Sequence, residues 1–284
     1  MAGEGLPIDV CCRVVGVSRS GFYVRRQRPV SKRAIRHAWL TDVIREVHGA
    51  SYGAYGSQRV RAELVIARGI PVSRKTVAAL MQRAGIAGRS GAPKRRWESS
   101  VPTAADLVDR TFRRSGPNQL WLTDMTEHPT REGKVYCAAV LDAFSRRVVG
   151  WSIGHNPTAA LTTNALAMAI EQREAVRGKT VIHSDHGTQF TSWAFSESVR
   201  SAGLVPSMGS TGDCYDNAMM EAFWSRMQVE LLDTRRWRTR IELANAIFEY
   251  IEVFHNRRRR HSSLGMLSPI EFELTNINTQ TQAA

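Results

Sequence analysis

The sequence predicts an α/β fold, a mixed sheet covered by helices, preceded by a helical domain of the helix-turn-helix type. Three observations predict it. Apolar residues recur at helical spacing in the first third of the chain, strand-like apolar runs begin at Gln119, and basic residues gather in the N-terminal part. Residues 1–114 hold 22 Lys and Arg against 8 Asp and Glu, a balance of +14, whereas residues 115–284 hold 17 against 18, a balance of −1. This asymmetry indicates that the first part binds a polyanion, with a merely solubilising basic surface as the alternative.

Composition limits the class of protein. With 284 residues and 43% hydrophobic content, the chain can bury one large core or two smaller ones. Its four cysteines form no C-x-x-C pair, so the sequence predicts neither a zinc site nor a disulfide framework and favours a reducing compartment. No apolar stretch approaches the roughly 20 residues of a membrane span, and none has the form of a signal peptide. We expect a soluble protein of the cell interior.

Helices are expected throughout the N-terminal part. Residues 11–30 predict a short helix, a Gly-Val-Ser turn and a basic exit. A longer helix is predicted over residues 33–48, where five apolar residues recur at helical spacing: Ile35, Trp39, Val43, Ile44 and Val47. Ser57 is placed to cap the next helix, whose expected apolar stripe is Val60, Leu64 and Val65.

The following helix carries the clearest sign of DNA recognition. After a turn at Gly69 and Pro71, Ser73 can cap a helix that begins with Arg74 and Lys75. Its inward-facing residues are expected to be Val77, Leu80 and Met81. A helix, a turn and a capped helix with a basic first turn fit a helix-turn-helix DNA reader, although a plain three-helix bundle would show the same spacing.

A linker is expected between the two parts. The stretch from Gly88 to Asp106 is rich in Gly, Ser, Pro and basic residues. Three of its basic residues are also candidates for phosphate contact: Lys94, Arg95 and Arg96. The predicted segments are a basic helical segment (1–32), a helix-turn-helix-like domain (33–90), a basic linker (91–115), an α/β core (116–234), and a C-terminal helix with a basic tail (235–284).

Strands and helices alternate in the second part. The runs "QLWLTDMTE", "KVYCAAVLDAF" and "RRVVGWSIG" predict three strands of an antiparallel meander. A helix capped by Thr158, the buried strand "KTVIHSD", a helix ending at Gly203 and the strand "LVPSM" follow. A helix with Asp216 as its N-cap and an amphipathic helix over 239–256 come last. The order β-β-β-α-β-α-β-α predicts a sheet with antiparallel strands first and parallel strands later.

Three acidic residues lie near the ends of these elements. Asp124 falls within the first strand, Asp185 ends the fourth, and Glu221 lies one turn into the helix after the fifth. The first and fourth strands can be neighbours, and a helix crossing their ends would add the third carboxylate. Converging carboxylates repel one another unless cations neutralise them, and oxygen-only ligands suit Mg²⁺ or Mn²⁺. Two such ions about 3.5–4 Å apart serve in-line phosphodiester displacement.

The spacing of these acids and the sequences around them resemble a known family. There are 60 residues between Asp124 and Asp185, and 35 between Asp185 and Glu221. With "HSDHGTQF" and "DNAMMEAFWSRMQVELL", this spacing is similar to the DDE catalytic core of retroviral integrases and bacterial transposases. The likeness is greatest to OrfB-type transposases of the IS-three class of insertion sequences. It continues through "YGSQRVRAEL", "VYCAAVLDAFSRRVVGW" and "FHNRRRRHSSLGMLSPIEFE", over roughly residues 10–275.

The resemblance implies an RNase H-like core and a metal-dependent DNA transposase. Asp124, Asp185 and Glu221 would be catalytic and would hold two Mg²⁺ or Mn²⁺ ions. Water would hydrolyse one strand at an element end, and the freed 3′-hydroxyl would attack another phosphodiester. The implied partners are terminal-repeat and target DNA, further copies of the chain in a homo-multimer, and possibly an OrfA partner frame. The implied location is the bacterial cytoplasm, at the nucleoid and not at a membrane.

Further residues are expected to contact DNA. The family often places Lys or Arg seven residues after the glutamate, where this chain has Gln228 on the same helix face. Gln228 can hydrogen-bond a phosphate or a base but supplies no charge. The run "NRRRRH" adds four candidates, with a solvated charge run as the alternative: Arg257, Arg258, Arg259 and Arg260.

Several neighbouring residues have plainer interpretations. His183 and His186 have no Cys nearby, so we expect them to orient the intervening aspartate or contact DNA instead of binding zinc. Glu127 falls on the other face of its strand from the catalytic candidate. Asp142 is explained equally as a turn residue and as a fourth acid. Packing is the expected role of four tryptophans: Trp121, Trp151, Trp193 and Trp224.

Two other functions compete with an active transposase. One is a catalytically inactive DNA-binding remnant or regulator of transposition, and the other is a nuclease or ribonuclease on the same fold. The presence of all three acids favours an active enzyme. The basic N-terminal part and the flanking motifs favour DNA ends over RNA hybrids.

Overall fold

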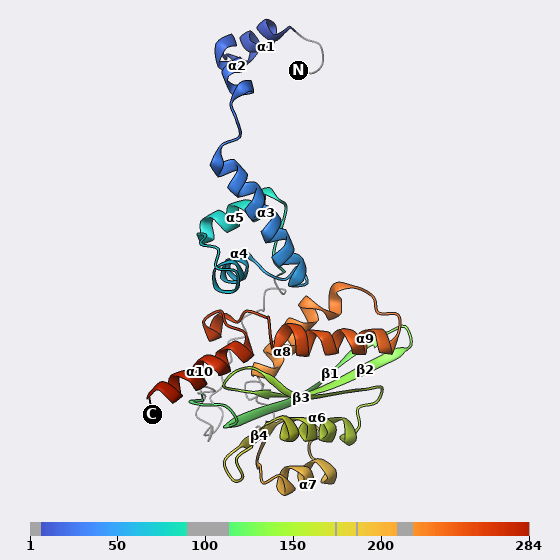
Figure 1. Cartoon of the computed structure of the whole chain (residues 1–284). Helices are drawn as coiled ribbons and strands as arrows, with labels where there is room; N and C mark the ends of the chain where they lie inside the picture. Colours follow the sequence, from blue (N-terminus) through green and yellow to red (C-terminus); the bar gives the residue numbers. More distant parts are fainter. Residues whose placement is uncertain (1–6, 90–113, 174, 186, 209–217, 284) are drawn as a thin grey trace, which may run out of the picture.

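The computed structural model describes residues 7–89, 114–173, 175–185, 187–208 and 218–283. A helical domain (residues 32–83) stands on an α/β core (residues 114–283), and a helical hairpin projects from the far end of the helical domain (Figure 1). None of the helices in these described ranges is long and apolar enough to cross a membrane.

The N-terminal hairpin consists of α1 (Ile8–Val15) and α2 (Arg19–Gln27). Gly16 ends α1 with a φ of 72°, which glycine adopts without strain. Ser18 caps α2, because its hydroxyl accepts a hydrogen bond from the Gly21 N–H at 3.1 Å. The expected short helix and Gly-Val-Ser turn are confirmed.

The helical domain contains α3 (Lys32–Ala50), α4 (Ser57–Ala62) with a π-helical continuation, η1 (Glu63–Ala67), and α5 (Arg74–Arg83). Its core is formed by apolar residues from all three helices: Leu40, Ile44, Val47, Val60, Leu64, Val77, Leu80 and Met81. The inward stripe predicted for α5 is therefore confirmed, whereas Ile35 and Trp39 of α3 are exposed.

The two predicted caps in this domain have different outcomes. Ser73 caps α5, with its hydroxyl accepting from the Thr76 N–H at 3.1 Å. The cap predicted at Ser57 is wrong, because Ser57 is the first helical residue and Gly56 occupies the cap position without a side-chain bond.

The core is built on one five-stranded sheet with the order β3-β2-β1-β4-β5. The antiparallel meander is β1 (Leu120–Thr130), β2 (Gly133–Asp142) and β3 (Val148–Gly154). The parallel strands β4 (Val181–Ser184) and β5 (Val205–Met208) add to the other edge of β1. This confirms the mixed sheet of the RNase H-like prediction.

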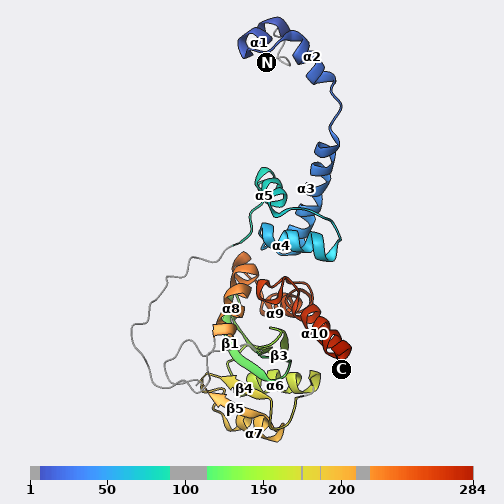
Figure 2. The same ribbon diagram turned by 90° about the vertical axis from the view of Figure 1, so that its left-hand side faces the viewer.

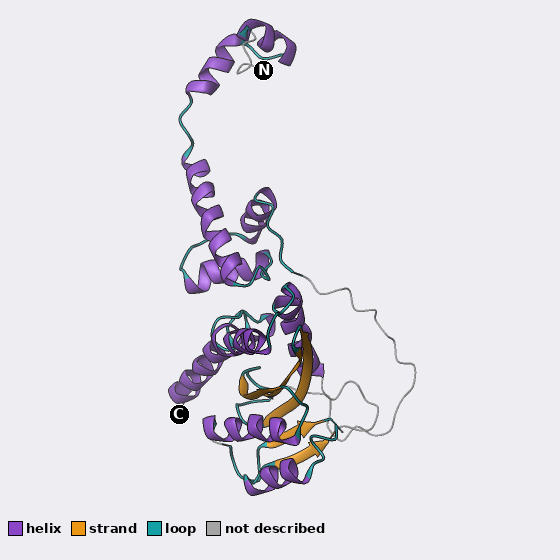
Figure 3. Ribbon diagram, turned by 90° about the vertical axis from the view of Figure 1, so that its right-hand side faces the viewer, coloured by secondary structure: helices purple, strands orange, loops and turns teal. Residues whose placement is uncertain are grey.

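Helices cover both faces of the sheet (Figure 3). One face packs against α6 (Ala159–Gln172) and α7 (Trp193–Ser201), around Trp121, Val140 and Ile182. The other packs against α8 (Ala218–Glu230) and α9 (Arg240–Phe248), around Leu120, Leu122 and Leu141. The last elements are η2 (Leu232–Thr234), η3 (Glu249–His255), η4 (Ser262–Leu264) and α10 (Pro269–Ala283).

Buried ion pairs of the C-terminal arginine run connect the core with the helical domain. Arg259 is 3% exposed and donates to both carboxylate oxygens of Glu230 in α8, at 2.7 and 2.6 Å. Arg260 binds Glu63 of η1 at 2.7 Å and Glu271 of α10 at 2.6 Å. The contact of Arg259 and Arg260 with DNA stays a prediction, and it would have to be made while carboxylates within the chain bind both guanidinium groups.

Candidate active site

The sheet places Asp124 and Asp185 side by side. β1 and β4 run parallel, with Leu122 opposite His183. Asp124 lies two residues after Leu122, and Asp185 lies two residues after His183, immediately after the end of β4. Continuing the same register therefore brings the two aspartates opposite each other. Neighbouring strands lie about 4.8 Å apart, which puts both residues at one point of the sheet. The expectation that the first and fourth strands are neighbours is confirmed.

Glu221 comes to this point from α8. It lies in the first turn of the helix, whose buried residues Met220, Phe223 and Met227 pack on the sheet face that carries Leu122. Asp124 shares this face with Leu122, because alternate residues of a strand point the same way. Figure 2 shows α8 beside β1, where the core meets the helical domain.

The charges of Asp185 and Glu221 both act on Asp124. Burial, followed by repulsion from Asp185 and then from Glu221, raises the pKa of Asp124 from 3.8 to about 6. Hydrogen bonds to its carboxylate oppose this rise. Asp124 is half-buried, whereas Asp185 and Glu221 are exposed, so the site is open to a large ligand.

Two hydrogen bonds hold the carboxylate of Asp124. The Met125 N–H donates to Oδ1 at 2.7 Å, and the indole N–H of Trp224 donates to Oδ2 at 3.1 Å. Trp224 follows Glu221 by three residues, so the same face of α8 supplies one carboxylate and orients another. The sequence interpretation of Trp224 as packing alone missed this contact, although the spacing from Glu221 was a signal for it.

A tight turn shapes the loop at Asp185. The Gly187 N–H donates to Asp185 Oδ1 at 2.9 Å. A Cβ on residue 187 would lie 2.9 Å from the same oxygen, closer than real Cβ contacts, which explains the glycine of "HSDHGTQF". His183 is buried and its Nδ1 lies 3.0 Å from the Ser207 hydroxyl of β5, so it joins two strands beside the site.

The donor set fits a hard divalent cation. It offers carboxylate oxygens, and in the described part of the chain none of the three acids forms an ion pair with a basic residue. Among those same residues, no three His, Cys, Asp or Glu side chains are already gathered closely enough to hold an ion. The mutual repulsion at Asp124 is the kind that Mg²⁺ or Mn²⁺ relieves.

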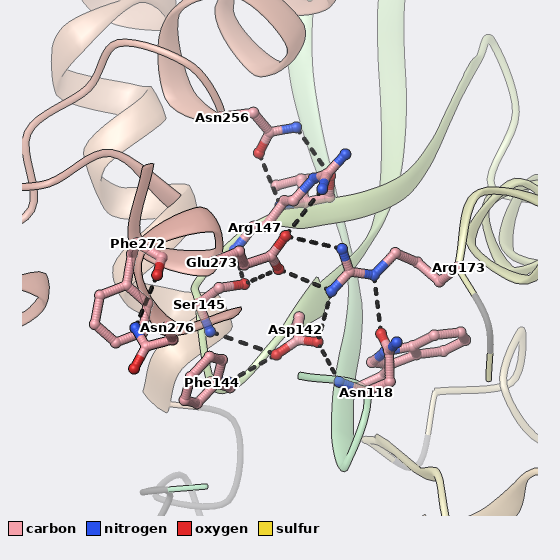
Figure 4. Close-up of polar contacts among 12 residues, drawn as sticks. Asn118, Asp142, Phe144, Ser145, Arg147, Arg173, Asn256, Phe272, Glu273 and Asn276 are labelled. Atoms are coloured by element: carbon pink, nitrogen blue, oxygen red, sulfur yellow. Dashed lines mark hydrogen bonds and ion pairs between the residues drawn. The ribbon is translucent and has the colours of Figure 1, made fainter. Parts of the chain in front are cut away.

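Asp142 is a structural residue at a separate place (Figure 4). It is fully buried and accepts hydrogen bonds from the N–H groups of Asn118 at 2.7 Å and Phe144 at 2.8 Å. Arg173 lies 3.4 Å from its carboxylate and binds Glu273 of α10 at 2.8 Å. Of the two interpretations left open for Asp142, the structure favours the turn residue.

Two further polar residues near the site bind within the chain. Glu127 pairs with Lys134 across β1 and β2, at 2.5 Å on the surface. The amide of Gln228 donates to Asp233 of η2, so its expected contact with DNA would require it to leave this partner.

The remaining DNA-contact candidates stay predictions. Arg74 and Lys75 are exposed in the first turn of α5, and Arg257 and Arg258 are exposed after η3. Other candidates lie outside the described residues: Lys94, Arg95, Arg96, His186 and Asp216.

Comparisons with known proteins identify related domains and relatives. Residues 114–214 and 202–269 match two family models described as "Integrase core domain", and residues 35–96 match "HTH-like domain". The chain is 37% identical over 275 residues to "Transposase InsF for insertion sequence IS3A" of Escherichia coli (strain K12), a match covering 95% of each protein. It is 36% identical over 264 residues to "Insertion element IS600 uncharacterized 31 kDa protein" of Shigella sonnei, covering 92% of this chain and 96% of that protein.

Solved structures are more distant. The integrase catalytic core domain of HTLV-2 in complex with magnesium is 19% identical, with a TM-score of 0.43, and the match covers 57% of this chain and 99% of that one.

Proposed function

The chain belongs to the InsF-like transposases of the IS3 family, with an HTH-like domain and an integrase core, and on this premise we propose that Asp124, Asp185 and Glu221 are its catalytic residues. These three carboxylates would hold two Mg²⁺ or Mn²⁺ ions. The enzyme nicks one strand at each end of its insertion sequence. The nick is a hydrolysis in which water breaks the bond between phosphorus and the 3′-oxygen. The freed 3′-hydroxyl then attacks the phosphorus of another phosphodiester and expels the 3′-oxygen of that strand, so one phosphodiester replaces another and no external energy source is needed.

Each residue has a task that follows from its surroundings. When bound, the divalent ions would activate the attacking oxygen and stabilise the leaving oxygen. Asp124 must be ionised to serve as a ligand, and the N–H groups of Met125 and Trp224 orient its oxygens and favour that charged form. Asp185 and Glu221 present exposed carboxylates from the two elements next to β1.

The observation that supports the proposal most is the shared electrostatics of the three acids. The pKa of Asp124 is raised by the charges of both Asp185 and Glu221, which lie 61 and 97 positions further along the chain. Because unpaired carboxylates that converge cost free energy, their placement favours a role that requires them together.

Strand nicking and joining at the terminal repeats test the proposal. Purified protein with Mg²⁺ or Mn²⁺ is expected to nick and join a terminal-repeat duplex, and Asp185→Asn is expected to abolish both steps while DNA binding persists. Glu127→Gln is the matched control, because Glu127 is an acid of β1 whose partner is a surface lysine. Full activity of Asp185→Asn would reject the assignment of the catalytic residues.

A further inference from the structure

A basic hollow lies on the other flank of α8 from the carboxylates. It contains about 620 Å³ of space, part of it open to solvent. Four arginines from different elements line it, and we call it the arginine pocket: Arg59 of α4, Arg146 of the turn after β2, Arg226 of α8, and Arg259. Its remaining lining residues are apolar, histidine or serine, so no acidic side chain from the described part of the chain lines it.

The positive charge of this pocket is only partly neutralised. Glu230, buried behind it, lies 2.6 Å from Arg259 and 3.9 Å from Arg59. Within the described residues, Arg146 and Arg226 form no ion pair. Four guanidinium groups therefore share one carboxylate.

The arginines are close enough to repel one another. Burial and then the charge of Arg259 lower the pKa of both Arg59 and Arg146, and Arg226 acts on Arg59 in the same direction. Burial, followed by Arg259, also lowers the pKa of His255 to about 4, so this histidine is neutral near pH 7. Its Nδ1 is buried without a hydrogen-bond partner. Because Nε2 donates to the Arg146 carbonyl, this Nδ1 is a lone-pair acceptor and does not itself attract an anion. The guanidinium charges that are held together favour a bound anion.

The pocket and the carboxylates lie on different flanks of the same helix. Arg226 follows Glu221 by five residues, which is about 7.5 Å along the axis and about 140° around it. A helix with its side chains is about 10–12 Å across. A strand of nucleic acid that crosses the N-terminal half of α8 can therefore reach both flanks. The pocket also joins Arg59, within the HTH-like match at 35–96, to core residues, which favours an extended ligand.

We propose that the arginine pocket binds one backbone phosphodiester of the substrate DNA, beside the phosphodiester that the carboxylates process. The assignment rests on the proposed function. Arg146 and Arg226 contact the phosphate, because their guanidinium groups are free of carboxylates and suit a phosphate geometrically. Arg59 and Arg259 are paired with Glu230 and add positive electrostatic potential to the pocket without contacting the phosphate.

Salt-dependent DNA binding tests this assignment without catalysis. The full chain is titrated with a fluorescent duplex in EDTA over a range of NaCl concentrations, and the slope of log K against log salt is compared between variants. One phosphate contact contributes about 0.9 to that slope. We expect Arg226→Ala and Arg146→Ala each to weaken binding, and the double variant to lower the slope by about 0.9 in total, because both arginines hold one phosphate. Arg226→Lys is expected to keep the slope.

The control and the contradicting results are defined by the same measurement. Arg200→Ala removes an exposed arginine of α7, on the other face of the sheet, and is expected to leave the slope unchanged. An unchanged slope in the double variant, or a loss of about 1.8 as for two separate contacts, would overturn the proposal. Because no divalent ion is present, a failure of the catalytic assignment would not affect this result. Arg226→Ala alters an exposed side chain.

Discussion

Replacing Arg259 with methionine tests whether the C-terminal arginine run is structural. Arg259 and Glu230 are 3% and 2% exposed, and Tyr250 donates the third hydrogen bond to the same carboxylate at 2.8 Å. Without Arg259 the partners that the described residues leave to this buried carboxylate are Tyr250 and the distant Arg59, at 3.9 Å. Breaking a buried ion pair by removing one partner costs about 3–5 kcal/mol. We expect a loss of that size in the free energy of unfolding.

Urea unfolding, followed by tryptophan fluorescence, measures this loss, and the adjacent residue supplies the control. Arg258 is exposed, so Arg258→Met is expected to change the free energy of unfolding by less than about 0.5 kcal/mol. Replacing both partners, as Glu230→Leu with Arg259→Met, is expected to recover part of the loss, because no unpaired buried charge remains. A cost below about 1 kcal/mol for Arg259→Met would refute the reasoning.

The pH dependence of this stability has a defined sign. Burial raises the pKa of Glu230, but its hydrogen bonds and charge interaction with Arg259 outweigh burial, so the pKa in the folded protein is lowered. The contribution of the pair is therefore present above the pKa of an unfolded glutamate, about 4.3, and is lost as pH falls through the folded value. The difference in stability between wild type and Arg259→Met should narrow in acid.

Two more substitutions separate the site from its surroundings. Trp224→Phe removes a hydrogen bond that lowers the pKa of Asp124, so Mn²⁺ binding should require a higher pH than in wild type. Trp193 is exposed, and Trp193→Phe should leave the pH dependence of Mn²⁺ binding unchanged. Identical pH dependence in all three proteins would contradict the role of Trp224. Asp142→Ala leaves two buried N–H donors unpaired and should lower the free energy of unfolding by about 3 kcal/mol or more. Its Mn²⁺ affinity should equal that of wild type. A loss of Mn²⁺ binding would instead make Asp142 a fourth ligand.

The sequence predicted the sheet because its strands carry local signals. Alternating apolar runs define β1, β2 and β3, and the order of elements places β4 next to β1. With that pairing known, Asp124 and Asp185 follow from strand register alone. Glu221 was predicted from its position one turn into the helix that follows the fifth strand. These features depend on short-range patterns, which a single sequence contains.

The features that the sequence missed are mainly contacts between distant parts of the chain. Four consecutive arginines have no periodicity that shows which are buried, and the acids that bind Arg259 and Arg260 lie as far away as Glu63. Trp224 looked like packing because its ring is apolar, whereas its N–H serves Asp124. The cap predicted at Ser57 was misplaced by one residue, since α4 already begins at Ser57. Sequence patterns locate a helix start only to within one or two residues.

Calorimetric titration of Mn²⁺ into the DNA-free protein tests most directly whether three distant carboxylates form one cation site. Wild type is expected to bind Mn²⁺ and, near pH 6, to release protons, because Asp124 with a pKa of about 6 must ionise. Asp124→Asn, Asp185→Asn and Glu221→Gln should each weaken binding about tenfold or more, or about 1.4 kcal/mol, and Glu127→Gln should not. Equal Mn²⁺ affinity in wild type and all three variants would contradict the shared site.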